Sequence, residues 1–99
     1  MKIFLVCSGG MSTGLLANAM KKEAALQQIQ SDIEAISLSA LPKRLPEAAV
    51  VLVAPQVRHR YSDIESSAKA LGKPVGLIDG VAYGTMNGKI VLRQALDLT

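Results

Sequence analysis

Short apolar runs alternate with amphipathic segments along the whole chain. Four of these runs predict β-strands, at Lys2–Val6, Asp32–Ser37, Val50–Ala54 and Pro74–Ile78. The first, third and fourth are almost continuously apolar, which is typical of parallel strands that are covered on both faces. The second run includes Glu34 and fits the edge of a sheet better.

The segments between these strands predict helices of unequal length. Positions 12–27 predict a long amphipathic helix. Its expected inward side consists of Leu15, Leu16, Ala19, Met20 and Leu26. Two prolines limit the next crossover to a short helix around positions 40–45, because proline interrupts a helix interior.

The third and fourth predicted helices have clearer boundaries. Ser62 and Glu65 have the spacing of a capping box, so we expect the third helix to begin at Ser62. Gly72 and Pro74 then end it. The fourth helix is expected over positions 87–98.

This alternation predicts the fold class. We expect an α/β fold over residues 1–99, as one doubly wound domain. Its parallel four-stranded sheet has the order 2-1-3-4, with helices on both faces. Ligand sites in such sheets lie beyond the carboxyl ends of the strands, where the strand order reverses. Cys7 follows the first strand and the loop at positions 55–60 follows the third, so both should reach one crevice.

Composition narrows the possible functions. Hydrophobic residues make up 49% of the chain and only Phe4, Tyr61 and Tyr83 are aromatic, so the core must be aliphatic. The net charge of +3 is scattered, without a basic run interleaved with stacking aromatics, which disfavours nucleic-acid binding. Apolar runs are too short to span a bilayer, and the lone cysteine forms no internal disulfide. We therefore expect a cytoplasmic protein that does not insert into the membrane.

Cys7 is the most informative residue in the sequence. It ends the first apolar run and opens a loop that reads Ser8-Gly9-Gly10-Met11-Ser12-Thr13-Gly14 before a helix. Free backbone N–H groups and the dipole at a helix N-terminus favour an anion, and the same field stabilises a thiolate. The segment thus combines a nucleophile with a cradle for a phosphoryl group. The alternative is an ordinary buried cysteine, although such a residue does not require the glycines and hydroxyls that follow.

Several kinds of cysteine and phosphate chemistry lack their motif here. The C-x5-R loop of phosphatases needs an arginine where Thr13 stands, and that arginine clamps the transferring group. Neither a nucleotide-binding glycine motif nor a C-x-x-C pair is present. A phosphatase-like enzyme and a non-catalytic anion-binding regulatory module remain the alternatives to a phosphoryl carrier.

Polar residues after the third and fourth strands are secondary candidates. Asp79 is either a general acid or a turn residue, and Tyr83 is either part of a turn or a hydroxyl placed near the Cys7 loop. His59 is either a chemical group or a solvated loop residue. Its neighbours Arg58 and Arg60 are either surface charge or contacts for a phosphate or a partner.

Three blocks of the sequence resemble a known family. They read Cys7-Ser8-Gly9-Gly10-Met11-Ser12-Thr13-Gly14-Leu15-Leu16, Val51-Leu52-Val53-Ala54-Pro55-Gln56-Val57 and Ile78-Asp79-x-x-x-Tyr83-Gly84-x-x-Asn87-Gly88. In this order and spacing they resemble the IIB component of the lactose/cellobiose (chitobiose) type of bacterial sugar phosphotransferase systems. The resemblance implies a sheet of order 2-1-3-4, similar to low-molecular-weight tyrosine phosphatases.

The resemblance also implies a reaction and its partners. Cys7 would accept a phosphoryl group from a phosphohistidine on a IIA protein. It would pass the group to a sugar that is carried by the membrane component IIC, and the resemblance implies a β-linked disaccharide. The implied phosphate loop consists of Ser8, Gly9, Gly10, Met11, Ser12 and Thr13, acting chiefly through backbone N–H groups. Gln56, Asp79 and Tyr83 are possible auxiliary residues, and no cofactor or metal is expected.

Met11 has two alternative roles in this loop. It is either a buried loop anchor or an apolar contact for the partner protein. With Leu15 or Leu16 it would form the apolar part of a docking rim. Arg58 or Arg60 would then steer an acidic partner toward that rim.

Overall fold

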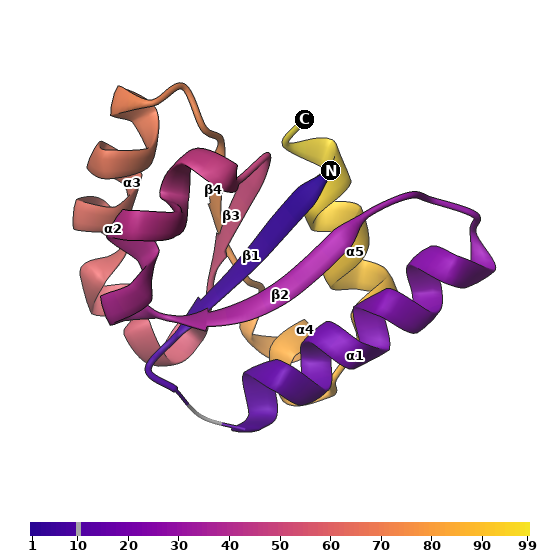
Figure 1. The fold of residues 1–99 in the computed structure, drawn as a ribbon. Coiled ribbons are helices and arrows are strands. Elements are labelled where there is room, and N and C mark those ends of the chain that lie inside the picture. Colours follow the sequence, from indigo (N-terminus) through magenta and orange to yellow (C-terminus); the bar gives the residue numbers. More distant parts are fainter. Residues whose placement is uncertain (10) are drawn as a thin grey trace.

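Four parallel strands form one sheet in the order β2-β1-β3-β4 (Figure 1). The computed structural model describes residues 1–9 and 11–99, the side chain of Met11 apart. The strands are β1 (Lys2–Cys7), β2 (Asp32–Ser37), β3 (Val50–Val53) and β4 (Val75–Leu77). The predicted α/β class, with its parallel sheet in the order 2-1-3-4, is confirmed.

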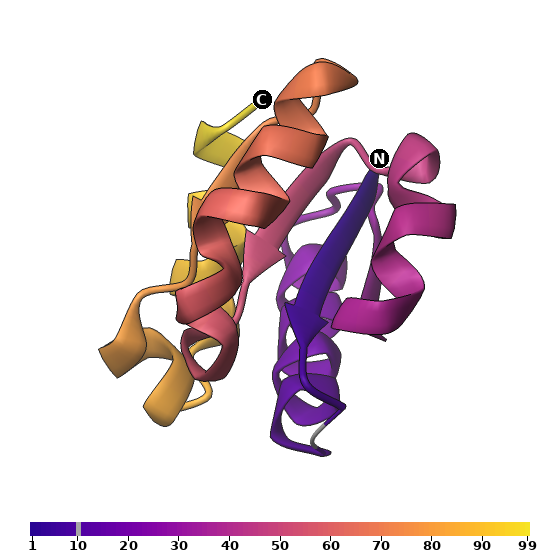
Figure 2. The ribbon, with the colours of Figure 1, turned by 90° about the vertical axis from the view of Figure 1, so that its left-hand side faces the viewer.

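Helical segments cover both faces of the sheet. The α-helices are α1 (Met11–Leu26), α2 (Leu41–Arg44), α3 (Tyr61–Ala70), α4 (Gly80–Gly84) and α5 (Gly88–Asp97). Shorter 3-10 segments are η1 (Leu38–Ala40), η2 (Leu45–Glu47) and η3 (Pro55–Arg60). Figure 2 looks onto α2 and α3, with the sheet behind them and α1 and α5 on the far face.

The central strands are buried as their apolar sequences predict. β1 pairs with both β2 and β3, which places Cys7 opposite Ser37 and Val6 opposite Val53. Residues Ile3 to Val6 and Val50 to Val53 are fully buried, and Phe4 is the aromatic residue among them. The chain leaves β1 at one end of the sheet, whereas both termini lie at the other end (Figure 1).

The inward face of α1 differs in part from the prediction. Leu16 and Met20 are fully buried, but Leu15 is 57% exposed and Leu26 is 79% exposed. The buried stripe also includes Ala17 and Ala24, because α1 packs against both the sheet and α5. That stripe has helical spacing, and Leu15 lies to one side of it.

Close packing of α1 and α5 depends on Gly88, at the start of α5. A Cβ atom added to Gly88 would lie 2.6 Å from the backbone carbon of Ala19. Asn87 caps α5 beside it, because its side-chain oxygen accepts a hydrogen bond from the N–H of Ile90.

The predicted start of α3 is wrong, whereas its end is confirmed. Segment η3 leads directly into α3, so the N-cap is Arg60 and no side chain caps the helix. Ser62 already lies inside the helix and therefore forms no capping box. At the other end Gly72 has a φ of +70°, and Lys73 donates its N–H to the carbonyl of Ala68 at 2.8 Å. This is the glycine-ended helix stop expected from the sequence.

Candidate functional site

The thiol of Cys7 lies at the carboxyl end of the central strand β1. Cys7 is buried, with 5% of the residue exposed. Sγ accepts a hydrogen bond from the backbone N–H of Gly9 at 3.4 Å, and it donates one to the carbonyl of Ile36 at 3.5 Å. A backbone N–H directed at the sulfur is the kind of contact that stabilises a thiolate.

The contact with Ile36 was not anticipated from the sequence. Ile36 pairs with Val6 in the register of β1 and β2, so its carbonyl comes close to the residue that follows Val6. The predicted strand order already placed β2 beside β1. The signal that identifies this carbonyl is the register of β1 and β2, which pairs Val6 with Ile36.

The loop after Cys7 requires glycine at its second position. Gly9 has a φ of +109°, a region that side chains with a Cβ rarely adopt. In the same loop the Gly9 N–H points back toward the sulfur of Cys7. Helix α1 begins two residues later and is 16 residues long, so its free N–H groups and its dipole face the loop. The predicted roles of Gly10 and of the Met11 side chain lie outside the described residues.

Tyr83 brings three of the predicted site residues together. Its hydroxyl oxygen lies 2.8 Å from Oγ1 of Thr13, 3.1 Å from Oγ of Ser12 and 2.8 Å from Nε2 of Gln56. Thr13 is 1% exposed and Tyr83 is 7% exposed, so their contact is buried, whereas the contacts with Ser12 and Gln56 are only part-buried. Of the two roles considered for Tyr83, the hydroxyl near the Cys7 loop is the one that the structure shows.

Asp79 contributes to this arrangement as a helix cap. Its Oδ2 accepts a hydrogen bond from the N–H of Ala82 at 2.9 Å, which starts the short helix α4. Tyr83 follows one residue later and points its hydroxyl toward α1. The sequence suggested turns in this region, but the structure has a capped helical turn that holds Tyr83 in place.

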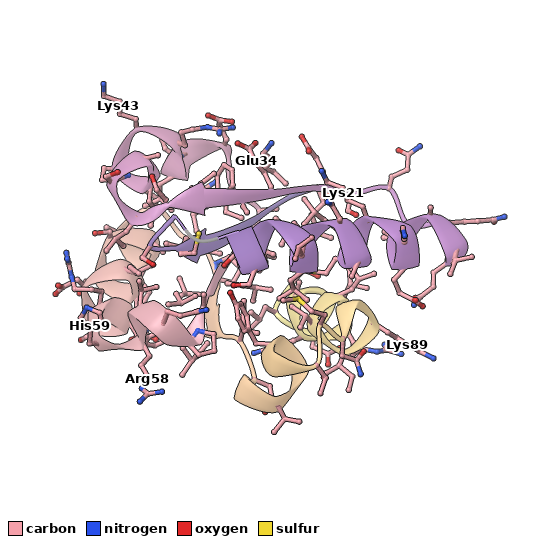
Figure 3. All side chains as sticks on the ribbon, turned by 90° about the horizontal axis from the view of Figure 1, so that it is seen from below. Lys21, Glu34, Lys43, Arg58, His59 and Lys89 are labelled. Atoms are coloured by element: carbon pink, nitrogen blue, oxygen red, sulfur yellow. The ribbon has the colours of Figure 1, made fainter. Side chains whose placement is uncertain are left out.

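The loop expected after β3 is the 3-10 segment η3, and its basic residues face solvent. Arg58, His59 and Arg60 are exposed, and Figure 3 shows Arg58 and His59 pointing away from the protein. Arg60 forms an ion pair with Asp63 at 3.2 Å. These side chains are therefore available to a partner that approaches from solvent.

A charged cluster occupies the edge of the sheet on β2. The carboxylate of Glu34 accepts hydrogen bonds from both terminal nitrogens of Arg44, and from Nζ of Lys2 at 2.7 Å. Hydrogen bonds from Arg44, and then from Lys2, lower the pKa of Glu34 to about 2. Arg44 and Lys2 also lie over the ring of Phe4, at 5.1 and 5.4 Å from its centroid. Charged groups at a sheet edge discourage pairing with another strand.

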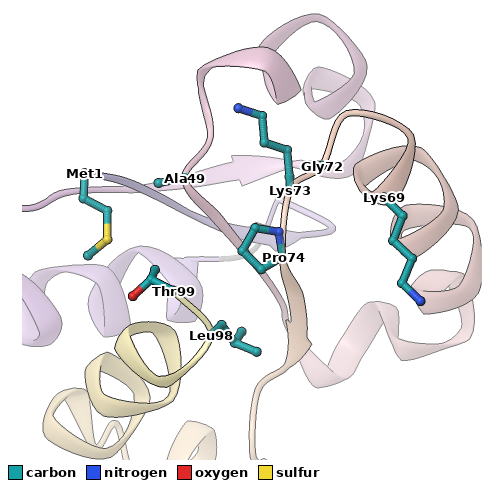
Figure 4. Close-up of a pocket in the computed structure, with 8 residues that line it drawn as sticks. All are labelled: Met1, Ala49, Lys69, Gly72, Lys73, Pro74, Leu98 and Thr99. Atoms are coloured by element: carbon teal, nitrogen blue, oxygen red, sulfur yellow. The ribbon is translucent and has the colours of Figure 1, made fainter.

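A depression of about 670 Å³ lies far from Cys7, at the amino ends of the strands (Figure 4). It is lined by both chain ends, by Ala49 and Pro74, and by Lys69, Gly72 and Lys73. Cys7 is at the carboxyl end of the same sheet, so this depression belongs to a different part of the molecule.

Comparison with known proteins identifies close relatives. A model of the family described as "PTS system, Lactose/Cellobiose specific IIB subunit" matches residues 2–94. The chain is 36% identical over 97 residues to the oligo-beta-mannoside-specific EIIB component of Bacillus subtilis, covering 98% of this chain and 94% of that protein. It is 35% identical to the galactose-specific EIIB component of Lactococcus lactis subsp. cremoris, covering 97% and 94%.

Solved structures have the same fold. The lactose-specific IIB domain of Streptococcus pneumoniae matches with a TM-score of 0.90 at 23% identity, covering 99% of this chain and 96% of that one. The cellobiose-specific IIB component of Borrelia burgdorferi matches with a TM-score of 0.82 at 40% identity, covering 99% and 90%. Within the described part of the chain, no helix combines the length and the apolar character needed to cross a bilayer.

Proposed function

The chain belongs to the lactose/cellobiose-specific IIB family of the sugar phosphotransferase system, and we propose that it carries a phosphoryl group on Cys7. Membership of this family supports a role in phosphoryl transfer during sugar uptake. The observation that carries the finer proposal is the contact between Cys7 Sγ and the N–H of Gly9, in front of the N-terminus of α1. A nucleophile and an anion-favouring field thus share one loop.

Phosphoryl transfer onto the chain is a nucleophilic displacement at phosphorus. The Cys7 thiol gives up its proton, and the sulfur attacks the phosphorus of a phosphohistidine on the IIA protein. The S–P bond forms as the P–N bond breaks, and the bonding pair leaves with the imidazole nitrogen. The imidazole recovers a proton, so that a thiol and a phosphohistidine become a phosphocysteine and a histidine.

The second transfer returns the site to its starting state. An oxygen of a sugar hydroxyl, held by the membrane component IIC, attacks the phosphorus on Cys7. The P–O bond forms as the S–P bond breaks, and the bonding pair leaves with the sulfur. The sugar hydroxyl loses its proton and the sulfur gains one, which restores the thiol. The buried position of Cys7 supports transfer over hydrolysis, since it limits the access of water.

The loop residues divide the work between backbone and side chains. Backbone N–H groups of the Ser8–Thr13 loop bind the phosphoryl oxygens. The Thr13 hydroxyl already contacts Tyr83, so the contribution of Thr13 to the phosphate is through its N–H. Without an arginine at position 13 the loop lacks the guanidinium clamp of thiol phosphatases, which supports a phosphocysteine that persists long enough to be passed on.

The relatives support the proposed partners and sugar class. The lactose-specific EIICB component of Lactococcus lactis matches this chain over 82% of its length, which is 14% of that larger protein. This supports a IIC permease as the partner that holds the sugar acceptor, and we assign a IIA protein as donor, on the cytoplasmic side of the membrane. The relatives named for oligo-beta-mannoside and cellobiose support a β-linked disaccharide as substrate.

Phosphoryl labelling tests the assignment directly. The protein is incubated with phosphoenolpyruvate, the general phosphotransferase proteins and a matching IIA, and its intact mass is measured. We expect a gain of one phosphoryl group in the wild type and in His59→Ala, and no gain in Cys7→Ser. Labelling of Cys7→Ser would overturn the assignment. Anion binding without any covalent label would favour the regulatory module, and steady hydrolysis of an aryl phosphate would favour a phosphatase.

A further inference from the structure

The hydroxyl of Tyr83 joins three helical segments that follow the carboxyl ends of β1, β3 and β4. Ser12 and Thr13 belong to the start of α1, after β1. Gln56 belongs to η3, after β3, and Tyr83 itself lies on α4, after β4. One oxygen atom therefore connects the start of α1, next to the Cys7 loop, to the segments that follow β3 and β4.

The hydrogen-bonding capacity of this oxygen is fully used. A phenol has one donor and room for two acceptor contacts. The amide nitrogen of Gln56 can only donate, so it takes one acceptor position. Ser12 and Thr13 take the other two positions, one as donor and one as acceptor. The Tyr83 hydroxyl is thereby committed to protein groups, which suits a role in positioning rather than contact with the phosphoryl group.

The location of these contacts bears directly on the proposed chemistry. Ser12 and Thr13 lie in the first turn of α1, whose free N–H groups are those that face the Cys7 loop. In-line transfer between two proteins depends strongly on alignment, and a misplacement of about 1 Å can lower a rate about 100-fold. A bond network that holds this turn therefore affects the transfer rate even though none of its side chains need touch the phosphorus.

We infer that Tyr83 is a positioning residue for phosphoryl transfer, and that its hydroxyl holds the first turn of α1 in the geometry that accepts the group on Cys7. This inference rests on the proposed function of Cys7. Asp79 supports it indirectly, because the cap of α4 fixes the helical turn that carries Tyr83.

Removing the hydroxyl alone is the appropriate change. Tyr83→Phe keeps the buried ring and deletes all three contacts of the oxygen. The chain offers a matched control in Tyr61→Phe. The Tyr61 hydroxyl contacts the carbonyl of Val75 at 3.3 Å and Glu65 at 3.5 Å, and Tyr61 begins α3 on the other face of the sheet. Gln56→Met serves as a milder second variant, because Gln56 is exposed and its loss does not disturb the core.

Quenched-flow transfer from phosphorylated IIA, at several IIA concentrations, provides the test. We expect Tyr83→Phe to lower the maximal transfer rate at least tenfold while the apparent KM for IIA changes less than twofold. Gln56→Met should lower the maximal rate about threefold, and Tyr61→Phe should transfer at the wild-type rate. A merely structural role would instead reduce the fraction of active protein, which the burst amplitude of labelled protein measures separately.

The outcomes separate the inference from the function on which it rests. If Cys7 is labelled in the wild type but Tyr83→Phe and Gln56→Met transfer at the wild-type rate, the positioning role is wrong and the carrier function stands. If Tyr61→Phe slows transfer as much as Tyr83→Phe, the effect is a general one and the positioning role is also wrong. If the wild type takes no label on Cys7, the proposed function itself fails.

Discussion

The Oγ1 atom of Thr13 lies 2.8 Å from the hydroxyl oxygen of Tyr83, although the two residues are 70 positions apart in the chain. Thr13 is 1% exposed, so its hydroxyl has no alternative partner in bulk water. A buried hydroxyl without a partner is costly, and this hydrogen bond between α1 and α4 therefore stabilises the fold.

Replacing Thr13 by valine tests the strength of this contact. Thr13→Val keeps the shape of the side chain and removes its hydroxyl, so we expect the free energy of unfolding to fall by about 1–2 kcal/mol. Thr85→Val is the control, because the Thr85 hydroxyl bonds to the carbonyl of Val81 on an exposed turn. Urea unfolding of both variants measures the difference. Equal losses in the two variants would contradict a special contribution from the buried contact.

The backbone conformation of Gly9 supplies a second prediction. Gly9→Ala forces a side chain into a φ of +109°, so we expect a loss of about 1–3 kcal/mol in the free energy of unfolding. Slower phosphoryl acceptance should accompany it, since the Gly9 N–H contacts the sulfur. Gly14→Ala, inside α1 with open space at the Cβ position, should instead stabilise the protein by about 0.5–1 kcal/mol. Thermal unfolding and labelling rates check both, and a Gly9→Ala variant as stable as the wild type contradicts the first expectation.

The cluster around Glu34 predicts a dependence of stability on acid. The pKa of Glu34 is lowered from 4.5 to about 2 in the folded protein. The stabilisation from this carboxylate is therefore complete above pH 4.5 and is lost as the pH falls from 4.5 toward 2. Glu34→Gln should lower the free energy of unfolding at neutral pH by about 1 kcal/mol, since the side chain is 36% exposed and water screens the pair. The gap to the wild type should close at low pH.

Glu65→Gln is the matched control for this experiment. Glu65 has the same exposure of 36%, but its single cation, Lys69, lies 3.8 Å away. We expect Glu65→Gln to change stability by less than about 0.5 kcal/mol at neutral pH. Urea unfolding across a pH series measures both variants. A difference between wild type and Glu34→Gln that stays constant down to pH 2 would rule out the ionised pair as its cause.

Docking of the phosphodonor supplies the last prediction. Leu15 is 57% exposed in the second turn of α1, whereas Leu16 is fully buried. Of these two candidates for the docking rim, Leu15 is therefore the one that can contact a partner. The other apolar candidate, the side chain of Met11, lies outside the described residues. We expect Leu15→Asp to slow transfer from IIA about tenfold, since loss of a central apolar contact commonly costs more than about 1 kcal/mol.

The same helix provides the control for the docking surface. Leu26→Asp changes an even more exposed leucine at the far end of α1, and it should transfer at the wild-type rate. Arg58→Ala should lower the rate mainly at low salt, because an exposed charge steers a partner more than it holds it. Quenched-flow rates across a salt series test the three variants together. Wild-type transfer by a folded Leu15→Asp variant places the docking surface elsewhere.

Local patterns in the sequence determined the main elements and the place of the candidate site. The uninterrupted apolar runs of β1 and β3 indicated central parallel strands, because only strands covered on both faces tolerate such runs. Glu34 marked β2 as the edge, where its side chain indeed pairs with Arg44 near solvent. Cys7, followed by glycine and hydroxyl residues, was recognisable because a loop between a strand and a helix is encoded by adjacent residues.

Only the tertiary structure decided which side chains meet. Ser62 had the spacing of a capping residue, but the preceding segment η3 is already helical and places Ser62 inside α3. Leu15 followed the helical pattern, but the direction from which α5 and the sheet approach α1 leaves it exposed. The contacts of Tyr83 with Thr13 and Gln56 join distant segments. Periodicity reports burial along one element, whereas such contacts depend on how separate elements pack, and that is a property of the whole fold.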